Sequence, residues 1–464
     1  MTHTLVIDQG THASRAIVFS STGSILNTAQ QSISLIQHSH SHIEQNPEAI
    51  LQSVQTVIQQ VLATSSNEIT NCALTTQRST ILAWHNESLK SLYPALSWQD
   101  TRSKDDLKQF LPHEKRIRQI TGLPLSPHYG AGKFRWLLNY LHHHTDNIKQ
   151  SFSLGPLASF LLCHLSSKQQ NQIDHSNAHR TLLFNINELK WSDELLTLFG
   201  IDRKYLPRCL PVQYDYGTLT NTGITISSVS GDQNAALFSQ GAIPDNTAIV
   251  NLGTGAFILA PCSKTITDDR LLKGIARSNG HTEYLLEGTV NGAGAALGWA
   301  ESQWPVTDLY HHLDTWLNTI TRPPIFINTI GSLGSPWWIS DVEPYFLTNS
   351  ENMRTEDRYV AIIESIVFLI HNNLQQLLNH FDIKTLRVSG GLSQLNGLCQ
   401  TLADLSGCSV NRLNDSEASA RGAAWLAAGC PENWSQQCSK TFSSISRTDL
   451  DQRYRQFTAE LSRF

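Results

Sequence analysis

The sequence lacks several features that would point to common classes of protein. No apolar run approaches the length of a membrane span, and the N-terminus lacks the basic and apolar segments of a signal peptide. The eight cysteines lie far apart without a C-x-x-C pair, so neither a zinc site nor a disulfide scaffold is indicated. Basic residues are scattered and the net charge is −5, which argues against nucleic acid as the main partner. We therefore expect a cytoplasmic protein with reduced thiols that binds neither nucleic acid nor a membrane.

The chain is nevertheless long and apolar enough for more than one core. Its 464 residues are 40% hydrophobic and 16% charged, which suits two or three domains. No low-complexity linker divides the chain. The best boundary is the segment 241–246, where glycine, proline and asparagine cluster.

The stretch Leu5–Ser20 has the pattern of two short strands joined by a tight turn. A strand over Thr4–Ile7 leads into Asp-Gln-Gly-Thr, and a second strand covers Arg15–Phe19. The turn gathers a carboxylate, two hydroxyl groups, an arginine and free backbone N–H groups, a set that suits a phosphate and its Mg²⁺. An ordinary hairpin with a polar tip is the alternative.

A second stretch, Ala248–Ala260, has the same order of strand, Gly-Thr turn and strand. Its Asn251 stands at the position that Asp8 occupies in the first stretch. Two such units predict a duplicated fold with two facing halves, whose turns could hold a polyphosphate between them. Because the match is short, chance similarity is the alternative.

Hydrophobic periodicity and turn residues predict further elements. Helices are expected over 46–63, from about 102, and over 133–143, 154–165, 191–199, 355–380, from about 395, and over 418–429. Strands are expected over 23–34, 68–76, 386–389 and 408–413, and residues 81–84 form a further short apolar run. Asp415 or Ser416 is expected to cap the last of these helices, and the residues after about Cys430 are expected to form a polar tail.

Several polar or aromatic side chains lie at the ends of predicted elements. Arg78 follows the strand 68–76 and Trp98 lies at a strand-to-loop junction, where open α/β sheets place ligands. A surface salt bridge and a core aromatic residue are the respective alternatives. Asp232 lies at a glycine-flanked helix start, so it could cap that helix or serve as a general base toward a hydroxyl group.

Glycines mark two places in the second half. Gly292, Gly294 and Gly298 have the wrong spacing for a dinucleotide-binding turn, so close helix packing is the better interpretation. The strand 386–389 ends at Gly390–Gly391, where a ligand could lie against bare backbone.

Taken in chain order, these stretches resemble the FGGY carbohydrate kinases, and within them the glycerol kinases. The similarity covers nearly the whole chain and rests on DQGT…SRAIVF, TTQRS, LSWQD, TGLPLSP, SNAHRTLLFNI, SGDQNAALF, NLGTGAF, VSGGLSQLN and ARGAAWLAA. It implies an α/β fold with two actin-like (ribonuclease H-like) ATPase domains facing across a cleft. Residues 1–241 would form the N-terminal domain, on the substrate side, and residues 242–464 the C-terminal domain, on the nucleotide side. The implied reaction is transfer of the γ-phosphoryl group of ATP, with Mg²⁺, to a hydroxyl group of a polyol or sugar.

The resemblance also implies roles for single residues. Asp232 matches the general base, and Asp8 matches the acidic residue near Mg²⁺, which we group with the catalytic residues. Phosphate and nucleotide contacts are expected at Thr11, His12, Arg15, Gly253, Thr254, Gly294, Gly390 and Gly391. The acceptor side is expected to comprise Arg78, Ser79, Trp98, His128, Asp232, Gln233 and Phe257.

Some positions depart from the glycerol-kinase pattern. Ser79 stands where a glutamate is expected, and His128 stands where a tyrosine is expected, although the adjacent Tyr129 could be the true match. His12 replaces the second threonine of DQGTT, and the segment 338–341 replaces an aromatic-Asp-Pro sequence. Losing the carboxylate removes a strong acceptor for hydroxyl groups and leaves room, so selectivity for glycerol does not follow from the resemblance.

We therefore expect direct in-line transfer, in which Asp232 accepts the proton of the attacking hydroxyl group and Arg15 stabilises charge on the transferred group. Domain closure is expected to exclude water. The acceptor could be glycerol, another small polyol, or a pentulose such as xylulose or ribulose. The rival interpretations are a non-catalytic sugar or nucleotide sensor and an actin-like ATPase. A serine hydrolase is unsupported, because the G-x-S-x-G sequence is absent. The oligomeric state is not determined, and a homodimer is one option left open.

Overall fold

The computed structural model describes residues 2–65, 68–144, 151–339, 342–348, 353–413, 417–434 and 438–464. The chain forms two compact units. The first comprises Met1–Ala242, Gly274–Tyr284 and Glu417–Gln436, and the second comprises Ile243–Lys273, Leu285–Ser416 and Gln437–Phe464. The first unit therefore includes two segments from the second half of the sequence.

A five-stranded sheet with the order β14-β6-β1-β2-β3 forms the centre of the first unit. β1 (His3–Gln9), β2 (Ala13–Phe19) and β3 (Ile25–Ser32) are joined antiparallel, as their alternating apolar residues predict. β6 (Ile69–Thr76) and β14 (Thr225–Gly231) run parallel to β1. The C-terminal ends of these three parallel strands therefore meet at one edge of the sheet.

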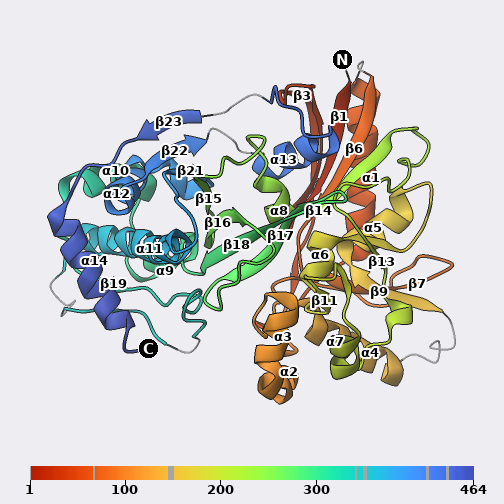
Figure 1. The fold of residues 1–464 in the computed structure, drawn as a ribbon, viewed down its shortest axis with the longest axis horizontal. Coiled ribbons are helices and arrows are strands. Elements are labelled where there is room, and N and C mark those ends of the chain that lie inside the picture. Colours follow the sequence, from red (N-terminus) through yellow and green to blue (C-terminus); the bar gives the residue numbers. More distant parts are fainter. Residues whose placement is uncertain are drawn as a thin grey trace. The chain divides into compact units, whose positions relative to one another are not determined.

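Two helices from distant parts of the sequence pack on this sheet. α1 (Pro47–Thr64) contacts β1, β2 and β3, and its N-cap Asn46 accepts a hydrogen bond from the backbone of Ala49. α13 (Ala418–Ala427) contacts β1, β6 and β14, so a segment near the C-terminus lies beside the first strands of the chain (Figure 1). Gly422 permits the approach, because a Cβ there would lie 1.8 Å from the carbonyl oxygen of Ala235.

The rest of the first unit consists of a second sheet, two short ladders and short helices. The second sheet has the order β4 (Ile36–Gln37), β5 (Ile43–Gln45), β8 (Ala95–Leu96), β7 (Ile81–His85), β9 (Phe152–Pro156). The ladders pair β10 (Gln172–Asp174) with β13 (Arg208–Leu210) and β11 (Phe184–Asn185) with β12 (Lys190–Trp191). The helices are α2 (Lys104–Leu107), α3 (Glu114–Thr121), α4 (Gly130–His144), α5 (Leu157–Leu165), α6 (His175–His179), α7 (Asp193–Phe199) and α8 (Asp232–Ala236), with 3₁₀ turns at Lys108–His113 and Arg203–Tyr205.

The second unit repeats the strand connectivity of the first. β15 (Thr247–Leu252) and β16 (Ala256–Cys262) form an antiparallel hairpin. β21 (Thr385–Ser389) is parallel to β15, and β22 (Ser409–Leu413) is parallel to β21. The order β16-β15-β21-β22 thus matches the order β2-β1-β6-β14, and Asn251 occupies the place of Asp8. The duplication predicted from the two hairpins is confirmed.

Five helices and further strands complete the second unit as described. The helices are α9 (Gly294–Gln303), α10 (Leu309–Thr319), α11 (Thr355–Leu378), α12 (Asn396–Ser406) and α14 (Thr448–Leu461), with a 3₁₀ turn at Gly391–Gln394. The strands are β19 (Phe326–Ile327), β20 (Tyr345–Phe346) and β23 (Cys438–Phe442), whereas β17 (Leu272–Ser278) and β18 (Thr282–Val290) each have residues in both units. The apolar face of α11 lies in the core of this unit, as its helical spacing of apolar residues predicts.

Two predicted helices in the first unit differ from the structure. The helix expected over 154–165 is strand β9 followed by α5, because Pro156 has extended backbone and immediately precedes the helix. The helix expected from about residue 102 is divided into α2, a 3₁₀ turn and α3, with Pro112 inside the 3₁₀ turn.

The prediction of a polar tail after Cys430 is wrong. β23 adds a strand beside β22 at the edge of the large sheet of the second unit, and α14 buries Leu450, Phe457 and Leu461 in the core of that unit. The expected helix cap, Asp415 or Ser416, lies outside the described residues, and so does part of the divergent segment 338–341. None of the helices in the described segments has both the length and the apolar character that a membrane span requires.

Candidate active site

The β1–β2 turn holds the first group of predicted residues at the edge of the sheet. The backbone N–H of Gly10 donates to the carbonyl oxygen of Ala13 at 3.0 Å, which closes the turn and leaves Thr11 and His12 at its tip. The Thr11 hydroxyl accepts a hydrogen bond of 2.9 Å from Nε1 of Trp98. The side chain of His12 is exposed. Thr11, predicted on the phosphate side, thus contacts Trp98, predicted on the acceptor side.

Three buried glutamines form a hydrogen-bond network that includes this turn. Nε2 of Gln77 donates to Oε1 of Gln9 at 3.1 Å and to Oε1 of Gln45 at 2.9 Å. Gln45 in turn donates to the carbonyl oxygen of Thr11 at 2.8 Å. Buried amide groups that satisfy one another hold a fixed conformation, so this network fixes the turn relative to β6. These glutamines were not predicted as site residues, since the contacts join residues far apart in the chain.

Arg15 lies between two carboxylates. Its Nη1 is 2.8 Å from Oε2 of Glu417 and 3.7 Å from Oδ2 of Asp8, and its Nε donates to Gln30 at 3.1 Å. Asp8 and Arg15 are direct partners in the β1–β2 register, which explains their proximity. Glu417, at the N-cap position of α13, was not predicted as a site residue, because it follows Arg15 by 402 positions.

Asp8 is only 8% exposed, and its surroundings favour the protonated form. Burial, helped by the nearby carboxylates of Asp232 and Glu417 and opposed by Arg15, raises the pKa of Asp8 to about 7. Asp8 and Asp232 are thus close enough to repel each other electrostatically.

The residues around Asp8 fit a divalent cation that arrives with its own ligands. Among the described residues, no three His, Cys, Asp or Glu side chains are arranged as a metal-binding group. Asp8 offers a carboxylate whose ionisation is disfavoured by Asp232 and Glu417, and a cation would relieve that repulsion. Mg²⁺ is commonly bound through one or two carboxylates together with phosphate oxygens and water, which matches this single donor.

Asp232 is the first residue of α8 and follows the last residue of β14. The N-cap position is occupied by Gly231, so the interpretation of Asp232 as the helix cap is wrong. Oδ1 of Asp232 accepts a hydrogen bond of 2.7 Å from the backbone N–H of Gln233. Burial raises the pKa of Asp232, while the Arg78 guanidinium, the hydrogen bond from Gln233 and Arg180 oppose the rise.

Arg78 lies directly beside this carboxylate. Its Nε is 3.8 Å from Oδ1 of Asp232, and its Nη1 donates to Oδ1 of Asn234 at 3.1 Å. The side chain of Arg78 packs on Gly231, where a Cβ would lie 2.6 Å from Cγ of Arg78. A glycine is therefore needed at the end of β14 for the arginine to reach Asp232.

The predicted acceptor residues of the first unit lie near one another. The rings of Trp98 and His128 meet edge to face, with centroids 5.5 Å apart. The residue beside Trp98 is therefore His128, while the buried Tyr129 packs against His128. Burial lowers the pKa of His128 to about 3, helped by Lys133, so its imidazole is neutral at physiological pH.

Ser79 is buried with a left-handed backbone, φ +63°. Its hydroxyl lies 3.5 Å from the carbonyl oxygen of Arg180, and its own carbonyl accepts a hydrogen bond of 3.0 Å from Nζ of Lys133. Lys133 was not predicted as a site residue.

The predicted nucleotide residues of the second unit gather around the β15–β16 turn. Gly253 N–H donates to the carbonyl oxygen of Gly255 at 2.9 Å, and Gly294 N–H donates to that of Gly253 at 3.0 Å. A Cβ at Gly294 would lie 2.9 Å from the Gly253 carbonyl oxygen. Gly390, with φ +94°, approaches the backbone of Leu252 so closely that a Cβ would lie 2.5 Å from its carbonyl oxygen. These glycines therefore allow three backbone segments to meet, with exposed Thr254 beside them.

Two predicted residues of that unit remain, Gly391 and Phe257. Gly391 begins a 3₁₀ turn and faces open space, since no atom lies within 4 Å of a Cβ built there. Phe257 on β16 pairs with Asn251. Because Phe257 belongs to the second unit, its place on the acceptor side stays a prediction.

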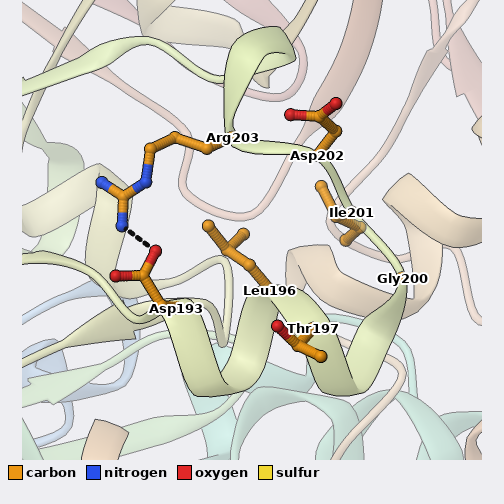
Figure 2. A pocket seen from close by; sticks show the side chains of 7 residues that line it. All are labelled: Asp193, Leu196, Thr197, Gly200, Ile201, Asp202 and Arg203. Carbon is orange, nitrogen blue, oxygen red and sulfur yellow. Dashed lines mark hydrogen bonds and ion pairs between the residues drawn. The ribbon is translucent and has the colours of Figure 1, made fainter.

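A separate hollow of about 390 Å³ lies at α7 in the first unit. Figure 2 shows its lining, in which Arg203 pairs with Asp193 at 2.5 Å. Asp202, also in the lining, pairs with Lys204 at 2.9 Å. The hollow contains none of the predicted site residues, and its charged groups are already paired.

Comparisons with known proteins agree with this arrangement. The model of the FGGY family of carbohydrate kinases, N-terminal domain, matches residues 3–239, and the model of the C-terminal domain matches residues 248–429. Glycerol kinase from Listeria monocytogenes serotype 4a (strain HCC23) is 31% identical over 445 residues, covering 91% of this chain and 89% of the relative.

Solved structures show the same fold. The Plasmodium falciparum glycerol kinase with ADP superposes with a TM-score of 0.89 at 23% identity, over 100% of this chain and 97% of that chain. The ligand-bound xylulose kinase from Lactobacillus acidophilus also gives 0.89, at 17% identity, over 100% and 98%. The chain therefore belongs to the FGGY family of carbohydrate kinases and is a phosphotransferase with the actin-like α/β fold of that family.

Proposed function

We propose that this kinase transfers the γ-phosphoryl group of ATP to a hydroxyl group of a small polyol or sugar, with Asp232 as the general base. The observation that carries the proposal is the setting of Asp232, which is fixed through Oδ1 by Gln233 N–H and Arg78 and lies within electrostatic range of Asp8. A carboxylate held by one oxygen can present the other to a substrate hydroxyl.

In the proposed step, the acceptor oxygen attacks the γ-phosphorus and forms the new P–O bond. The bond between this phosphorus and the β,γ-bridging oxygen breaks, ADP leaves with the electron pair, and the hydroxyl proton passes to Asp232. The raised pKa of Asp232 favours this transfer, because burial makes the carboxylate a better proton acceptor than one in water.

The phosphate side is assigned to the β1–β2 turn and to Arg15. The N–H groups of the turn and the Arg15 guanidinium would stabilise negative charge on the transferred group. Mg²⁺, when bound with ATP, neutralises phosphate charge, and Asp8 is the residue that would hold it. The turn around Gly253, Gly294 and Gly390 is assigned to the nucleotide, since it presents backbone without side chains.

The acceptor is proposed to be glycerol or another small polyol, with a pentulose as the second candidate. Arg78, Trp98, His128 and Gln233 would bind it. Ser79 favours the pentulose alternative, because a small side chain at the position of the expected glutamate leaves room and removes an acceptor for hydroxyl groups. The dispersed cysteines, all of them free, support our placement of the enzyme in the reducing cytoplasm.

The proposal is tested by measuring ADP release with ATP, Mg²⁺ and each of glycerol, xylitol, xylulose and ribulose. We expect one acceptor to stimulate ADP release and to yield a phosphorylated product. Asp232→Asn should then lower kcat by about 10²–10⁴-fold, the range typical of a lost general base. The matched control is Asp105→Asn, which alters a carboxylate that is 88% exposed in the same unit.

Three results would contradict all or part of the proposal. ATP hydrolysis without stimulation by any acceptor would indicate an actin-like ATPase, and nucleotide binding without turnover would indicate a sensor. Near-normal turnover by Asp232→Asn would exclude the base role while leaving the kinase assignment intact.

A further inference from the structure

Lys133 is a buried amine in the second turn of a helix whose start is built from small residues. Its relative exposure is 0%. A Cβ at Gly132 would lie 2.5 Å from Oγ of Ser103, and a Cβ at Gly130 would lie 2.9 Å from Cα of Thr181. The small residues therefore bring the start of α4 against neighbouring loops, and they place Lys133 among them.

The ammonium group of Lys133 contacts four backbone carbonyl groups. Nζ is 2.8 Å from the carbonyl oxygen of Ser97, 3.0 Å from those of Ser79 and His128, and 3.3 Å from that of Trp98. An ammonium group has three N–H donors, so at least two of these carbonyl groups share one hydrogen. The four carbonyl groups belong to three segments that are distant in sequence.

Each of these segments carries residues that we assign to the acceptor side. The first segment contains Arg78 and Ser79, the second contains Trp98, and the third contains His128. A further hydrogen bond joins the first two segments, since the backbone N–H of Trp98 donates to Oγ1 of Thr80 at 3.1 Å. The side chain of Lys133 is therefore bonded to all three segments.

The charged groups around Lys133 are few. Burial lowers the pKa of Lys133 to about 7, Asp100 opposes the decrease and Arg102 adds to it. His128 is neutral beside it. Since carbonyl dipoles compensate the ammonium charge only while all of them point at Nζ, the contact favours one arrangement of the three segments.

We propose that Lys133 is a positioning residue, which ties the three acceptor-side segments into one arrangement without itself touching the acceptor. The assignment of these segments to the acceptor rests on the proposed function, whereas the hydrogen bonds by which Lys133 joins them do not. The expected consequence of losing it is loosening of these segments and weaker acceptor binding, with little change in the binding of ATP.

Amide hydrogen exchange tests the tie independently of activity. In Lys133→Met, peptides covering 78–81, 97–100 and 126–130 should exchange at least about tenfold faster than in the wild type, while peptides of α11 should not change. Lys108→Met is the matched control, because Lys108 is 67% exposed in the same unit. Equal acceleration everywhere, or none in the three segments, would overturn the proposal. If the methionine variant does not fold, Lys133→Gln, which keeps an amide donor, is measured in the same way.

Kinetics then test the consequence for the acceptor. We expect the KM for the acceptor to rise at least about tenfold in Lys133→Met, the KM for ATP to stay within about threefold, and Lys133→Gln to recover part of the loss. A rise in the KM for ATP equal to that for the acceptor would overturn the positioning role. If the wild type phosphorylates no acceptor, the proposed function fails, and the exchange experiment alone decides whether Lys133 ties the segments.

Discussion

Nε1 of Trp98 donates a hydrogen bond of 2.9 Å to Oγ1 of Thr11. This bond joins a residue that we assign to the acceptor with one that we assign to the phosphate groups. Trp98 also contacts His128 through its ring, and Thr11 is held by Gln45 through its carbonyl oxygen. This single bond links the two sides, so binding of the acceptor and binding of ATP should be weakly coupled.

We predict that Trp98→Phe reduces this coupling. Phenylalanine keeps an aromatic ring beside His128 but cannot donate to Thr11. The KM for the acceptor should become less dependent on the concentration of ATP, and a double-mutant cycle with Thr11→Val should give an interaction free energy of about 1 kcal/mol. Strictly additive effects of the two substitutions on kcat/KM would show that the bond does not couple the sites.

Asp8 is predicted to reduce stability at neutral pH. Its pKa is about 7 in the folded protein and ordinarily 3.8, so the folded state favours the protonated carboxyl group. The stability that this group contributes is fully present below pH 3.8 and is lost as the pH rises through about 7. Asp8→Asn should therefore be more stable than the wild type by about 2–4 kcal/mol at pH 8 without metal, and the difference should vanish near pH 4.

Urea unfolding at pH 4 and pH 8, in the presence of a chelator, measures this difference. Addition of Mg²⁺ and ATP should raise the melting temperature of the wild type more than that of Asp8→Asn, because the carboxylate is the proposed metal ligand. A variant that is less stable than the wild type at both pH values would contradict the prediction.

Glu417 is predicted to affect the phosphate side through Arg15. Their contact of 2.8 Å holds the guanidinium near Asp8, and Glu417→Gln would keep a hydrogen-bond acceptor but remove the charge. We expect the KM for ATP to change by about two- to tenfold, with the KM for the acceptor unchanged. Glu432→Gln, an exposed glutamate in the same segment, is the control. An altered acceptor KM with a normal ATP KM would contradict this assignment.

The sequence predicted those parts of the site that depend on local pattern. The β1–β2 hairpin follows from alternating apolar residues around a Gly-Thr turn, and its register places Asp8 beside Arg15. The second hairpin has the same pattern, and the two together predict the duplicated fold. Arg78 follows a predicted strand and could be expected at the ligand-binding edge of the sheet, whereas the strand β14 that ends before Asp232 was not predicted.

Contacts between distant segments were not predictable from pattern. Glu417 and Lys133 reach the site only because α13 and α4 pack where they do, and no periodicity signals such a contact. The helix α14 was missed because charged residues separate its few apolar ones, so its mean hydropathy is low although Leu450, Phe457 and Leu461 are buried. The strand β9 was assigned to a helix because its apolar run is continuous with that of α5.

Ser79 gives a prediction about selectivity. Ser79 is 2% exposed, and its carbonyl oxygen is 3.0 Å from Nζ of Lys133. A carboxylate introduced at this position would therefore have the Lys133 amine nearby. If glycerol is a poor acceptor of the wild type, Ser79→Glu should increase kcat/KM for glycerol about tenfold or more relative to that for a pentulose, because the carboxylate accepts hydroxyl hydrogen bonds and fills space.

Ser79→Gln separates the effect of charge from that of size. Glutamine has the same length as glutamate but is neutral, and a neutral acceptor makes a weaker hydrogen bond to a hydroxyl group. If charge determines selectivity, the glutamine variant should lose the pentulose activity without gaining glycerol activity. Equal gains in the two variants would assign selectivity to volume alone, and unchanged ratios of kcat/KM in both would remove Ser79 from the set of acceptor residues. Melting temperatures within a few degrees of the wild type are required for either comparison, since φ +63° is a strained backbone conformation for glutamate and glutamine alike.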